Sequence, residues 1–487
     1  MKLKFNKNIL LIILLLIITY ISINYTQIFT YNSNSIELLT AISNPTVSQS
    51  KFNEHPMTTI NKNDILDFSN IVKSNSIRMQ AYNQLLIWAE TDIQKVQDNS
   101  KGCIVLQGYA TPADYARNPG LKEKAEKAIA IINAQTEGCS SKGNTNPFNI
   151  DYQRCYKYLL IYLVSKDTKY ADKIISIFKQ WSSNCKKIIG GNSALECSWV
   201  LTGYCRVQEI LMYTYTNGWK KSNIESDWNK FIDDLVLPPI INTMYKNNKI
   251  AGPGGQNWKT SANLARLMYS KVRQDKKQFN LCIKNAYICF DQLFGKYTSG
   301  QTIETSRDIG HAQMGLGGMA QMCEILFNHG IDLYSNKNNL LLKSYEFHAQ
   351  IILGKIKSIK DPTGPGKGGI NYPSFKSTGD WDIVYNHYVH VQKLKMPSTE
   401  QLLLINRPDN NLLMEHGLTT LTHYNGIPYS LPTTSRPPTT SRLPTTSRLP
   451  TTSRLPTTSR LPTTSRLPTT SRLPTTSRLP TTMDWMN

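Results

Sequence analysis

The feature that most constrains the fold is an apolar spacing of three and four residues that recurs from residue 56 to about residue 428. One stretch that shows it contains Leu121, Ala125, Ala128, Ile129 and Ile132. Others contain Ile174, Ile177, Phe178 and Trp181, and then Val207, Ile210 and Leu211. This spacing puts apolar side chains on one face of a helix, whereas the two-residue alternation of a strand is scarce. The sequence therefore predicts an all-α domain of many successive helices.

The length of this helical region narrows the architecture. Candidate breaks between helices are Gly190-Gly191, Pro238-Pro239 and the run from Gly252 to Gly255. A helical region that extends from residue 56 to about residue 428 is too long for a simple helix bundle. A ring of helical hairpins would satisfy the pattern, because each pair can bury its apolar faces against its neighbours. The stretch from Pro362 to Pro373 lacks the spacing and is expected to be irregular.

The chain divides by composition into five parts. We expect a signal peptide or signal anchor at residues 1–25, a linker at 26–55, the helical domain at 56–428, a low-complexity repeat at 431–482 and a C-terminal tail at 483–487. In the leader, Lys2, Lys4 and Lys7 precede an apolar run from Ile9 to Ile18, the layout of a secretory signal. The apolar zone extends toward membrane-spanning length, so an uncleaved anchor is left open. Both interpretations predict a secreted or extracellular domain, with a membrane contact only through the leader.

The repeat and the net charge bear on possible partners. The repeat unit, Leu-Pro-Thr-Thr-Ser-Arg, carries proline at every sixth position, so we expect an extended, solvated stalk. The chain has a formal net charge of +21, and +10 remains without the eight repeat arginines and the three leader lysines. A basic body favours polyanionic partners such as nucleic acids, anionic membranes or acidic polysaccharides. No nucleic-acid-binding module is recognisable, so no nucleic-acid partner is expected.

The cysteines bear on whether the domain contains disulfides. Nine cysteines in an exported chain predict some disulfides and, because the number is odd, at least one free thiol. Cys282 and Cys289 lie two turns apart if their segment is helical, roughly 10 Å by helix rise, which is too far for them to pair.

The most informative stretch for chemistry runs from Gly300 to Gly315. On a helix, Glu304, Arg307 (or Asp308) and His311 would share one face. A carboxylate, a guanidinium and an imidazole on one face are costly to bury unless they are paired. They form either a structural ion-pair stripe or part of an active site, and the spacing alone leaves both open.

Two further stretches contain candidate groups. The first is Gly254 to Trp258, where glycines allow close approach of a ligand, Asn257 offers an amide donor and Trp258 offers a face for stacking on a sugar, unless it is simply a core residue. In the second, Tyr385 and Tyr388 bracket His387 and could transfer protons, or form an aromatic core face. A metal ligand role for His387 is not favoured, because the sequence has no HExxH and no clustered carboxylates.

Together these stretches resemble the alginate lyase family. The resemblance rests on Gln301-x-x-Glu304-x-x-Arg307-Asp308-x-x-His311, followed by the element Gly330-Ile331-Asp332-Leu333-Tyr334. It extends to His55-Pro56, Ser193 to Leu195 with Trp199, Asn257-Trp258, and Tyr385 to Tyr388, and so covers about residues 55–426. The sequence is most similar to the branch of glucuronan lyases, polysaccharide lyase family 38. Bacterial alginate lyases have Asn-Asn-His where this chain has Gln256-Asn257-Trp258, so their active-site histidine is missing there.

The resemblance implies an (α/α) toroid and cleavage of acidic, uronate-containing polysaccharides such as alginate or glucuronan by β-elimination. It implies catalytic roles for Asn257, Arg307, His311, Tyr385 and Tyr388, with the first two holding the carboxylate and His311 and one tyrosine sharing the proton transfers. The substrate-binding residues that it implies are Gln301, Glu304, Trp258 and His387. It implies no metal and no cofactor, and it leaves the oligomeric state open.

Two other functions are compatible with the sequence. A glycoside hydrolase of the same fold would need two acidic residues flanking the bond, and Glu304 and Asp308 are available. A non-catalytic, stalked polysaccharide-binding protein is favoured by the repeat and the possible anchor. The complete set of Asn257, Glu304, Arg307 and His311 argues against that second alternative.

Overall fold

The computed structural model describes residues 45–94, 102–105, 147–189, 191–359, 370 and 373–426. Apart from Gly426, these residues belong to one compact unit of the chain, formed by residues 1–108 and 128–425. The predicted leader, repeat and tail lie outside the described residues. Within the described part, no helix has the length and apolar character needed to cross a membrane.

Helices make up most of this unit. In chain order the elements are α2 (Gln49–Phe52), α3 (Lys62–Leu66), α4 (Phe68–Lys73), α5 (Ser76–Asp92), β1 (Gly102–Val105), α8 (Pro147–Ser165), α9 (Thr168–Asn184), β2 (Cys185–Ile189), α10 (Ser193–Thr214), α11 (Thr216–Ser222), α12 (Ile224–Phe231), the π-helical turn η1 (Ile232–Val236), α13 (Leu237–Met244), β3 (Tyr245–Lys246), β4 (Lys249–Ile250), α14 (Gln256–Val272), α15 (Lys276–Phe294), the 3-10 turn η2 (Ile303–Ser306), α16 (Ile309–Asn328), α17 (Asn336–Ile352), η3 (Ser377–Gly379), α18 (Trp381–Tyr385), η4 (Asn386–Val391), α19 (Pro397–Asn406), β5 (Leu412–Leu413), β6 (His416–Gly417) and α20 (Thr419–His423).

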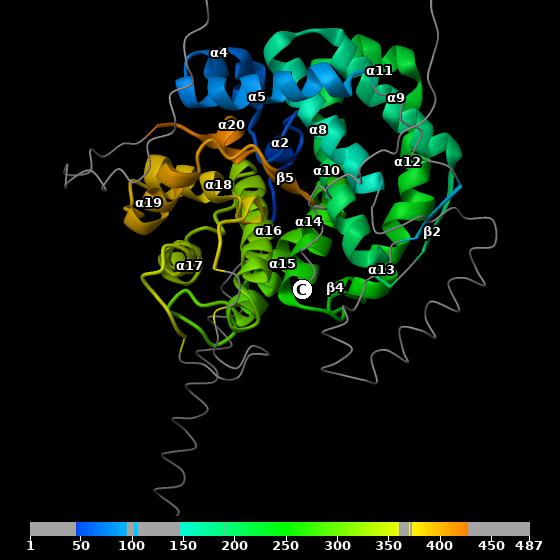
Figure 1. The fold of residues 1–487 in the computed structure, drawn as a ribbon. Helices are drawn as coiled ribbons and strands as arrows, with labels where there is room; N and C mark the ends of the chain where they lie inside the picture. The colour runs from blue at the N-terminus through cyan, green and yellow to red at the C-terminus, as the bar shows by residue number, and fades with distance from the viewer. Residues whose placement is uncertain are drawn as a thin grey trace, which may run out of the picture. The chain divides into compact units, whose positions relative to one another are not determined.

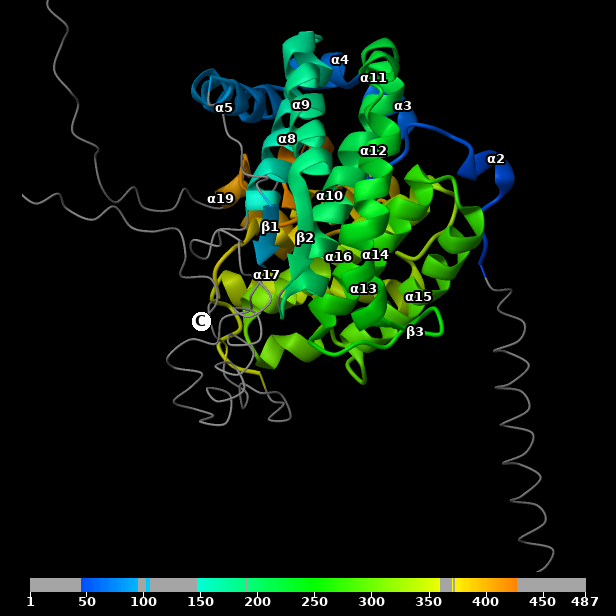
Figure 2. The same cartoon turned by 90° about the vertical axis from the view of Figure 1, so that its right-hand side faces the viewer.

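Neighbouring helices pack side by side as hairpins. α8 packs on α9, α14 packs on α15, and α10 lies between α8 and α14, while α14 also contacts α16 (Figures 1 and 2). The described strands form only two-stranded pairs: β1 with β2, β3 with β4, and β5 with β6. The predicted all-α fold is therefore confirmed, and the hairpins form an incomplete toroid that does not close into a barrel.

The central helices differ from the outer ones in burial. α10 is buried on every side from Ala194 to Leu211, and α14 is buried from Thr260 to Val272. A helix that is buried all round lies in the interior of a domain. In contrast, α9 buries one face, and its buried side chains include the four that the sequence predicts, Ile174, Ile177, Phe178 and Trp181. This expectation is confirmed.

Glycines let α16 approach its neighbours closely. A Cβ atom on Gly318 would lie 3.1 Å from the hydroxyl of Thr260 on α14. A Cβ atom on Gly317, on another face of α16, would overlap the carbonyl oxygen of Thr378. These contacts bring the third turn of α16 close to the second turn of α14 and to η3, next to the candidate site.

The predicted linker at residues 26–55 is too long at its C-terminal end. Val47 and Phe52 are buried in the core, and the Val47 N–H donates to Asn280 Oδ1 at 3.0 Å. The ammonium of Lys271 donates to the carbonyls of Phe52 and Glu54, at 2.5 and 2.7 Å. The packed domain therefore begins before residue 56. The sequence did not reveal this, because one buried aromatic residue in a polar stretch gives no periodic pattern.

The predicted disulfides are absent among the seven cysteines whose side chains the structure describes. All seven are buried and free: Cys155, Cys185, Cys197, Cys205, Cys282, Cys289 and Cys323. Cys282 and Cys289 both lie on α15, as the sequence predicts, and they do not pair. Each of the seven occupies the core as a small apolar side chain, and burial raises the pKa of the Cys197 and Cys323 thiols well above the usual range.

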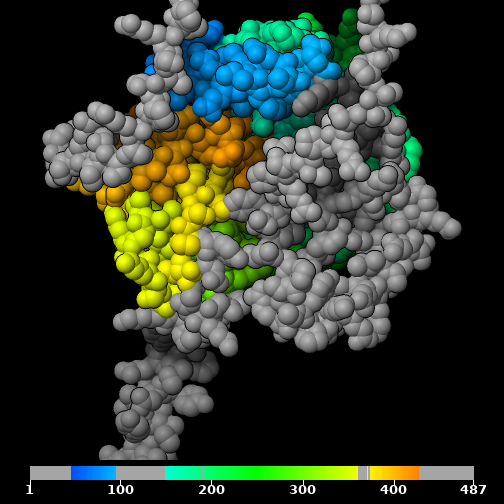
Figure 3. Space-filling model, in the orientation of Figure 1, coloured from blue at the N-terminus to red at the C-terminus, as the bar shows by residue number. Residues whose placement is uncertain are grey.

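The C-terminal boundary of the domain leads to a first prediction. Arg78 on α5 donates from Nε to the carbonyl of Tyr424 at 2.6 Å and from Nη2 to Asn425 Oδ1 at 2.9 Å, and α5 adjoins the C-terminal segment in Figure 3. We expect that removal of residues 431–487 leaves the melting temperature and the turnover of short soluble substrates unchanged. A chain that ends at Leu418 loses α20 and the partners of Arg78, and should unfold at a lower temperature. Equal destabilisation by both truncations would place the domain boundary beyond residue 431.

Candidate active site

The stretch from Gly300 to Gly315 is not the continuous helix that the sequence predicts. η2 ends at Ser306, and Asp308 is extended, with φ −166° and ψ 154°. Asp308 caps α16, because its Oδ1 accepts the backbone N–H of His311 at 2.7 Å. Aspartate is a strong N-cap, and here the cap starts a new helix in place of continuing the preceding turn. The predicted shared helical face is therefore wrong, although the turn still brings Glu304, Arg307 and His311 together.

Asp308 and His311 form a hydrogen-bonded pair. His311 Nδ1 lies 2.6 Å from Asp308 Oδ2, and since a carboxylate only accepts, Nδ1 carries the hydrogen. In a neutral imidazole this leaves Nε2 with the lone pair, and the side chain of His311 is 27% exposed. Burial alone would raise the pKa of Asp308, but the hydrogen bonds and charge of His311, with the charge of Arg307, hold it below its usual value. The pair therefore presents a base with a fixed tautomer.

Arg307 lies beside this pair. Its Nη1 is 3.4 Å from Glu304 Oε2, and its Nε is 4.0 Å from Asp308 Oδ2. Its side chain is 40% exposed, whereas that of Glu304 is 6% exposed. The two carboxylates thus orient the guanidinium, and a substantial part of it faces solvent, where it could meet an anionic ligand.

Glu304 joins two halves of the site. Its Oε1 accepts the backbone N–H of Gln256 at 2.8 Å, at the start of α14, while Oε2 faces Arg307. The next residue on α14, Asn257, is buried, and its Oδ1 has no hydrogen-bond partner among the described residues. Glu304 is therefore engaged with protein groups, which differs from the substrate-binding role that the resemblance implies. The unpaired atom of Asn257 is thus its amide oxygen, an acceptor, and only the amide nitrogen of this side chain could donate to a ligand carboxylate.

Gln301 and Trp258 are placed less favourably than Arg307 and His311 for direct contact with a substrate. Gln301 is buried, and its Nε2 has no hydrogen-bond partner among the described residues. Trp258 is half-buried and packs against the core, and its ring lies against Gly254, where a Cβ atom would be 2.7 Å away. Gly254 has φ +91°, so glycine is favoured there for backbone and packing reasons alike.

Tyr385, His387 and Tyr388 are buried core residues, and their burial does not support the catalytic and binding roles that the resemblance implies. The hydroxyl of Tyr388 donates to the carbonyl of Tyr334 at 2.8 Å, and burial raises its pKa well above the usual range. The His387 ring stacks on Tyr334 with centroids 3.6 Å apart. Tyr385 is also buried. The aromatic cluster of Tyr334, His387 and Tyr388 matches the alternative of a core face. Tyr385 is buried apart from it, with the Arg407 guanidinium over its ring, so neither tyrosine is exposed.

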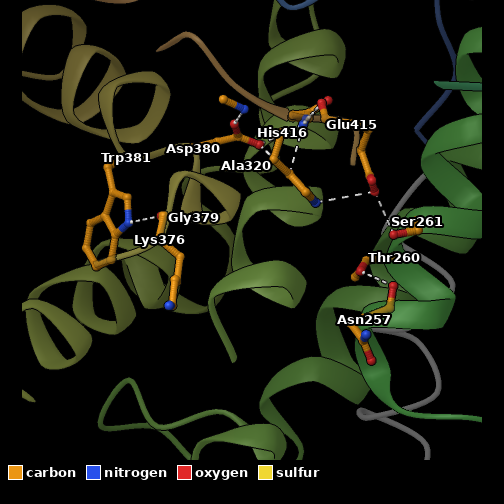
Figure 4. Close-up of polar contacts among 12 residues, drawn as sticks. Asn257, Thr260, Ser261, Ala320, Lys376, Gly379, Asp380, Trp381, Glu415 and His416 are labelled. Atoms are coloured by element: carbon orange, nitrogen blue, oxygen red, sulfur yellow. Dashed lines mark hydrogen bonds and ion pairs between the residues drawn. The ribbon is translucent and has the colours of Figure 1, made fainter. Parts of the chain in front are cut away.

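A buried polar network, which the sequence did not indicate, lies one helical turn from Asn257. Figure 4 shows Asn257 and Ser261 along one side of α14, with Glu415 and His416 next to Ser261 and Asp380 beyond them. Ser261 donates to Glu415 Oε1 at 2.7 Å, and His416 bridges Glu415 (Nε2 to Oε1, 3.3 Å) and Asp380 (Nδ1 to Oδ2, 2.6 Å). Burial opposes the charged imidazole, but the two carboxylates outweigh it and raise the pKa of His416 to about 10. The network ties α14 to the C-terminal hairpin β5–β6.

Other surface features lie away from these residues. A hollow of about 710 Å³ is lined by α9, Tyr215 and α11, including Lys179 and Lys221, and a second of about 540 Å³ is lined mainly by α12 and η1. Among the described residues, no three histidine, cysteine, aspartate or glutamate side chains are grouped so that they could hold a metal ion.

Comparison with known proteins adds a family to this geometry. A family model described as alginate lyase matches residues 109–357, which is more than half of the chain. The chain is also similar to the crystal structure of alginate lyase A1-III from Sphingomonas species A1, with a TM-score of 0.41 and 12% sequence identity over 60% of this chain and 82% of that chain. A comparison with curated proteins found no match. The matched range contains Asn257, Arg307 and His311.

Proposed function

The chain belongs to the alginate lyase family and is a polysaccharide lyase, and we propose that it cleaves polyuronates by β-elimination at the site formed by Asn257, Arg307, Asp308 and His311. In a uronate, the C5 proton lies next to a carboxylate, and its removal creates an enolate-like dianion. An enzyme must neutralise that charge with preorganised donors and must supply a base for C5.

Each step can be assigned to a residue. The guanidinium of Arg307 and the amide of Asn257 bind the substrate carboxylate and stabilise the charge that develops on it. Nε2 of His311 removes the C5 proton, and the electron pair of the C5–H bond forms the C4–C5 double bond as the C4–O4 bond breaks. The departing O4 then takes a proton. The observation that carries this proposal is the 2.6 Å contact from His311 Nδ1 to Asp308, which fixes Nε2 as the basic nitrogen.

The same assignment favours particular substrates. With both candidate tyrosines buried, we propose that His311 returns the proton it has gained to O4. One group can serve both atoms only if the C5 proton and O4 lie on the same face of the sugar. Glucuronate and mannuronate satisfy this condition, and guluronate, the C5 epimer of mannuronate, does not. We therefore propose glucuronan or polymannuronate as the substrate.

The test is a panel of glucuronan, polymannuronate and polyguluronate incubated with the purified protein. Elimination leaves an unsaturated uronate, whose ultraviolet absorbance should rise with the first two polymers. Absorbance with polyguluronate alone would contradict the single-group assignment. No absorbance with any polyuronate would contradict the proposed function.

The proposed chemistry leads to a prediction for metal removal. Arg307 and Asn257 supply the donors for the carboxylate, so we expect turnover to be unchanged in excess chelator. Melting temperature should be followed in parallel, because a structural cation would affect folding and not the chemical step. Complete loss of turnover in a chelated protein that stays folded, with recovery on adding a divalent ion, would contradict the assignment to Arg307.

A further inference from the structure

We propose that His348 is a positioning residue, which holds the turn carrying Glu304 and Arg307 through a one-directional hydrogen-bond chain to Thr305 and Thr302. The inference rests on the proposed function, because it concerns the same site. Thr305 lies on η2 between Glu304 and Arg307, and His348 lies on α17, far away in sequence.

The direction of each hydrogen bond follows from its partners. His348 Nδ1 lies 2.8 Å from the carbonyl oxygen of Ser344, which can only accept, so Nδ1 carries the hydrogen. Nε2 of the neutral ring must then accept, and its neighbour at 2.9 Å is the hydroxyl of Thr305. The Thr305 hydroxyl therefore donates to His348. Its oxygen accepts the backbone N–H of Thr302 at 2.9 Å and lies 2.9 Å from the Thr302 hydroxyl.

Because this hydrogen-bond chain is buried, each of its bonds must be made within the protein. Thr302, Thr305 and His348 are all fully buried, so water cannot replace a lost partner. A buried hydroxyl without an acceptor is costly, and the turn would shift to find one. Burial also lowers the pKa of His348 to about 4, so the ring keeps an accepting Nε2 at neutral pH.

The turn transmits its position to the site on both sides. The carbonyl of Glu304 accepts the backbone N–H groups of Arg307 and Asp308, at 2.9 and 3.1 Å. The carboxylate of Glu304 accepts from Gln256 at the start of α14. A shift of the turn would thus move Arg307, Asp308 and the end of the helix that carries Asn257. A misplacement of about 1 Å at a reacting centre can cost roughly 100-fold in rate.

Two pairs of variants test the chain. His348→Leu and Thr305→Val remove the acceptor and the donor, and each should lower kcat roughly 10- to 100-fold with a smaller change in KM. His348→Gln keeps an acceptor near the Nε2 position, and Thr305→Ser keeps the hydroxyl, so both should retain most of the turnover. The double variant His348→Leu/Thr305→Val should be no slower than Thr305→Val alone, because both single changes remove the hydrogen bond from Thr305 to His348 and Thr305→Val also removes the acceptor of the Thr302 N–H.

The matched control is His329→Leu. His329 is another buried histidine with a lowered pKa, and its Nδ1 binds the carbonyl of Ile325 near the far end of α16. This variant should lose stability and keep the kcat of the wild type. If His348→Leu behaves like His329→Leu, or if the two single effects are additive, the positioning role is refuted. Should His348→Leu fail to fold, the Thr305→Val and Thr305→Ser pair decides alone.

The outcome can be separated from that of the proposed function. Absence of elimination by the wild type would refute the function, whereas the hydrogen-bond chain has its own readout. Nitrogen-15 NMR should show His348 as the neutral tautomer protonated at Nδ1 at neutral pH, in the wild type and in Thr305→Ser. Observation of the Nε2–H tautomer would refute the chain whatever the activity.

Discussion

His311→Ala should lower turnover by roughly two to four orders of magnitude, the range usual for loss of a group that transfers a proton. The side chain is partly exposed, and its one described hydrogen-bond partner beyond the backbone is Asp308, which keeps its capping bond to the backbone of residue 311 in the variant. Melting temperature and substrate binding should therefore change little. Turnover and thermal unfolding should be measured on the same preparation.

Two further variants separate the proton-transfer role from the capping role at this position. Asp308→Asn retains an oxygen for the N-cap, since asparagine caps as well as aspartate, but loses the charge that orients the imidazole. With its oxygen on the cap, the asparagine amide nitrogen would face Nδ1 and donate to it, which moves the ring hydrogen to Nε2. Turnover should therefore fall about as far as in His311→Ala, and stability should stay nearly unchanged. The control is His390→Ala, at a partly exposed histidine of η4, which should change neither turnover nor stability. A His311→Ala protein that is destabilised but fully active would return the pair to a structural role.

His416→Leu should have the largest effect on stability. The variant leaves the carboxylates of Asp380 and Glu415 buried without the imidazolium between them. Loss of one partner from a buried ion pair typically costs about 3–5 kcal/mol of unfolding free energy. Denaturant unfolding below pH 6.5 measures this difference. The control is His423→Leu, at a buried histidine whose pKa is lowered to about 4 and which binds the carbonyl of Thr59; it should cost only about 1–3 kcal/mol.

The pH dependence of this difference has a definite sign. The folded-state pKa of His416 is about 10, above its ordinary value of 6.5, so the folded protein binds an extra proton between these values. The stabilisation that protonated His416 contributes is fully present below about pH 6.5 and is lost as pH rises toward about 10. The gap between wild type and His416→Leu should therefore narrow over that range. A gap that stays constant or widens would show that His416 is not charged in the folded state.

The helical fold could be predicted because it depends on local periodicity. The apolar residues of α9 and the glycine-rich break before α14 are where the spacing places them. Pro238-Pro239, predicted as a break, instead lies in the first turn of α13, where proline is tolerated because the first N–H groups of a helix need no partner within it. The irregular stretch predicted from Pro362 to Pro373 lies almost wholly outside the described residues.

The candidate site residues could be chosen from the sequence, but their geometry could not be predicted. The spacing of Glu304, Arg307 and His311 along the chain is the same whether they lie on one helix or on a turn followed by a capped helix. The sequence therefore did not reveal the N-cap at Asp308. Tyr385 and Tyr388 have the chemistry of proton-transfer groups, and only tertiary packing shows that they are buried. Asp380 and His416 are brought together by the packing of the C-terminal hairpin, for which the sequence has no periodic signal.

The competing hydrolase function loses support in the same geometry. Glu304 is buried against Gln256 and Arg307, and Asp308 is bound to His311. Hydrolysis with retention or inversion would need one carboxylic acid and one carboxylate that flank the bond and reach the substrate. Neither residue is free for that role in this arrangement.

The most direct test of the account is the mass of the products from a short, defined glucuronate or mannuronate oligomer. β-Elimination consumes no water, so the masses of the two product chains should add up to that of the substrate, and one product should absorb in the ultraviolet. His311→Ala protein that is folded should form neither product at a comparable rate. Products whose masses add up to the substrate plus one water, without the absorbance, would contradict the account and identify a hydrolase.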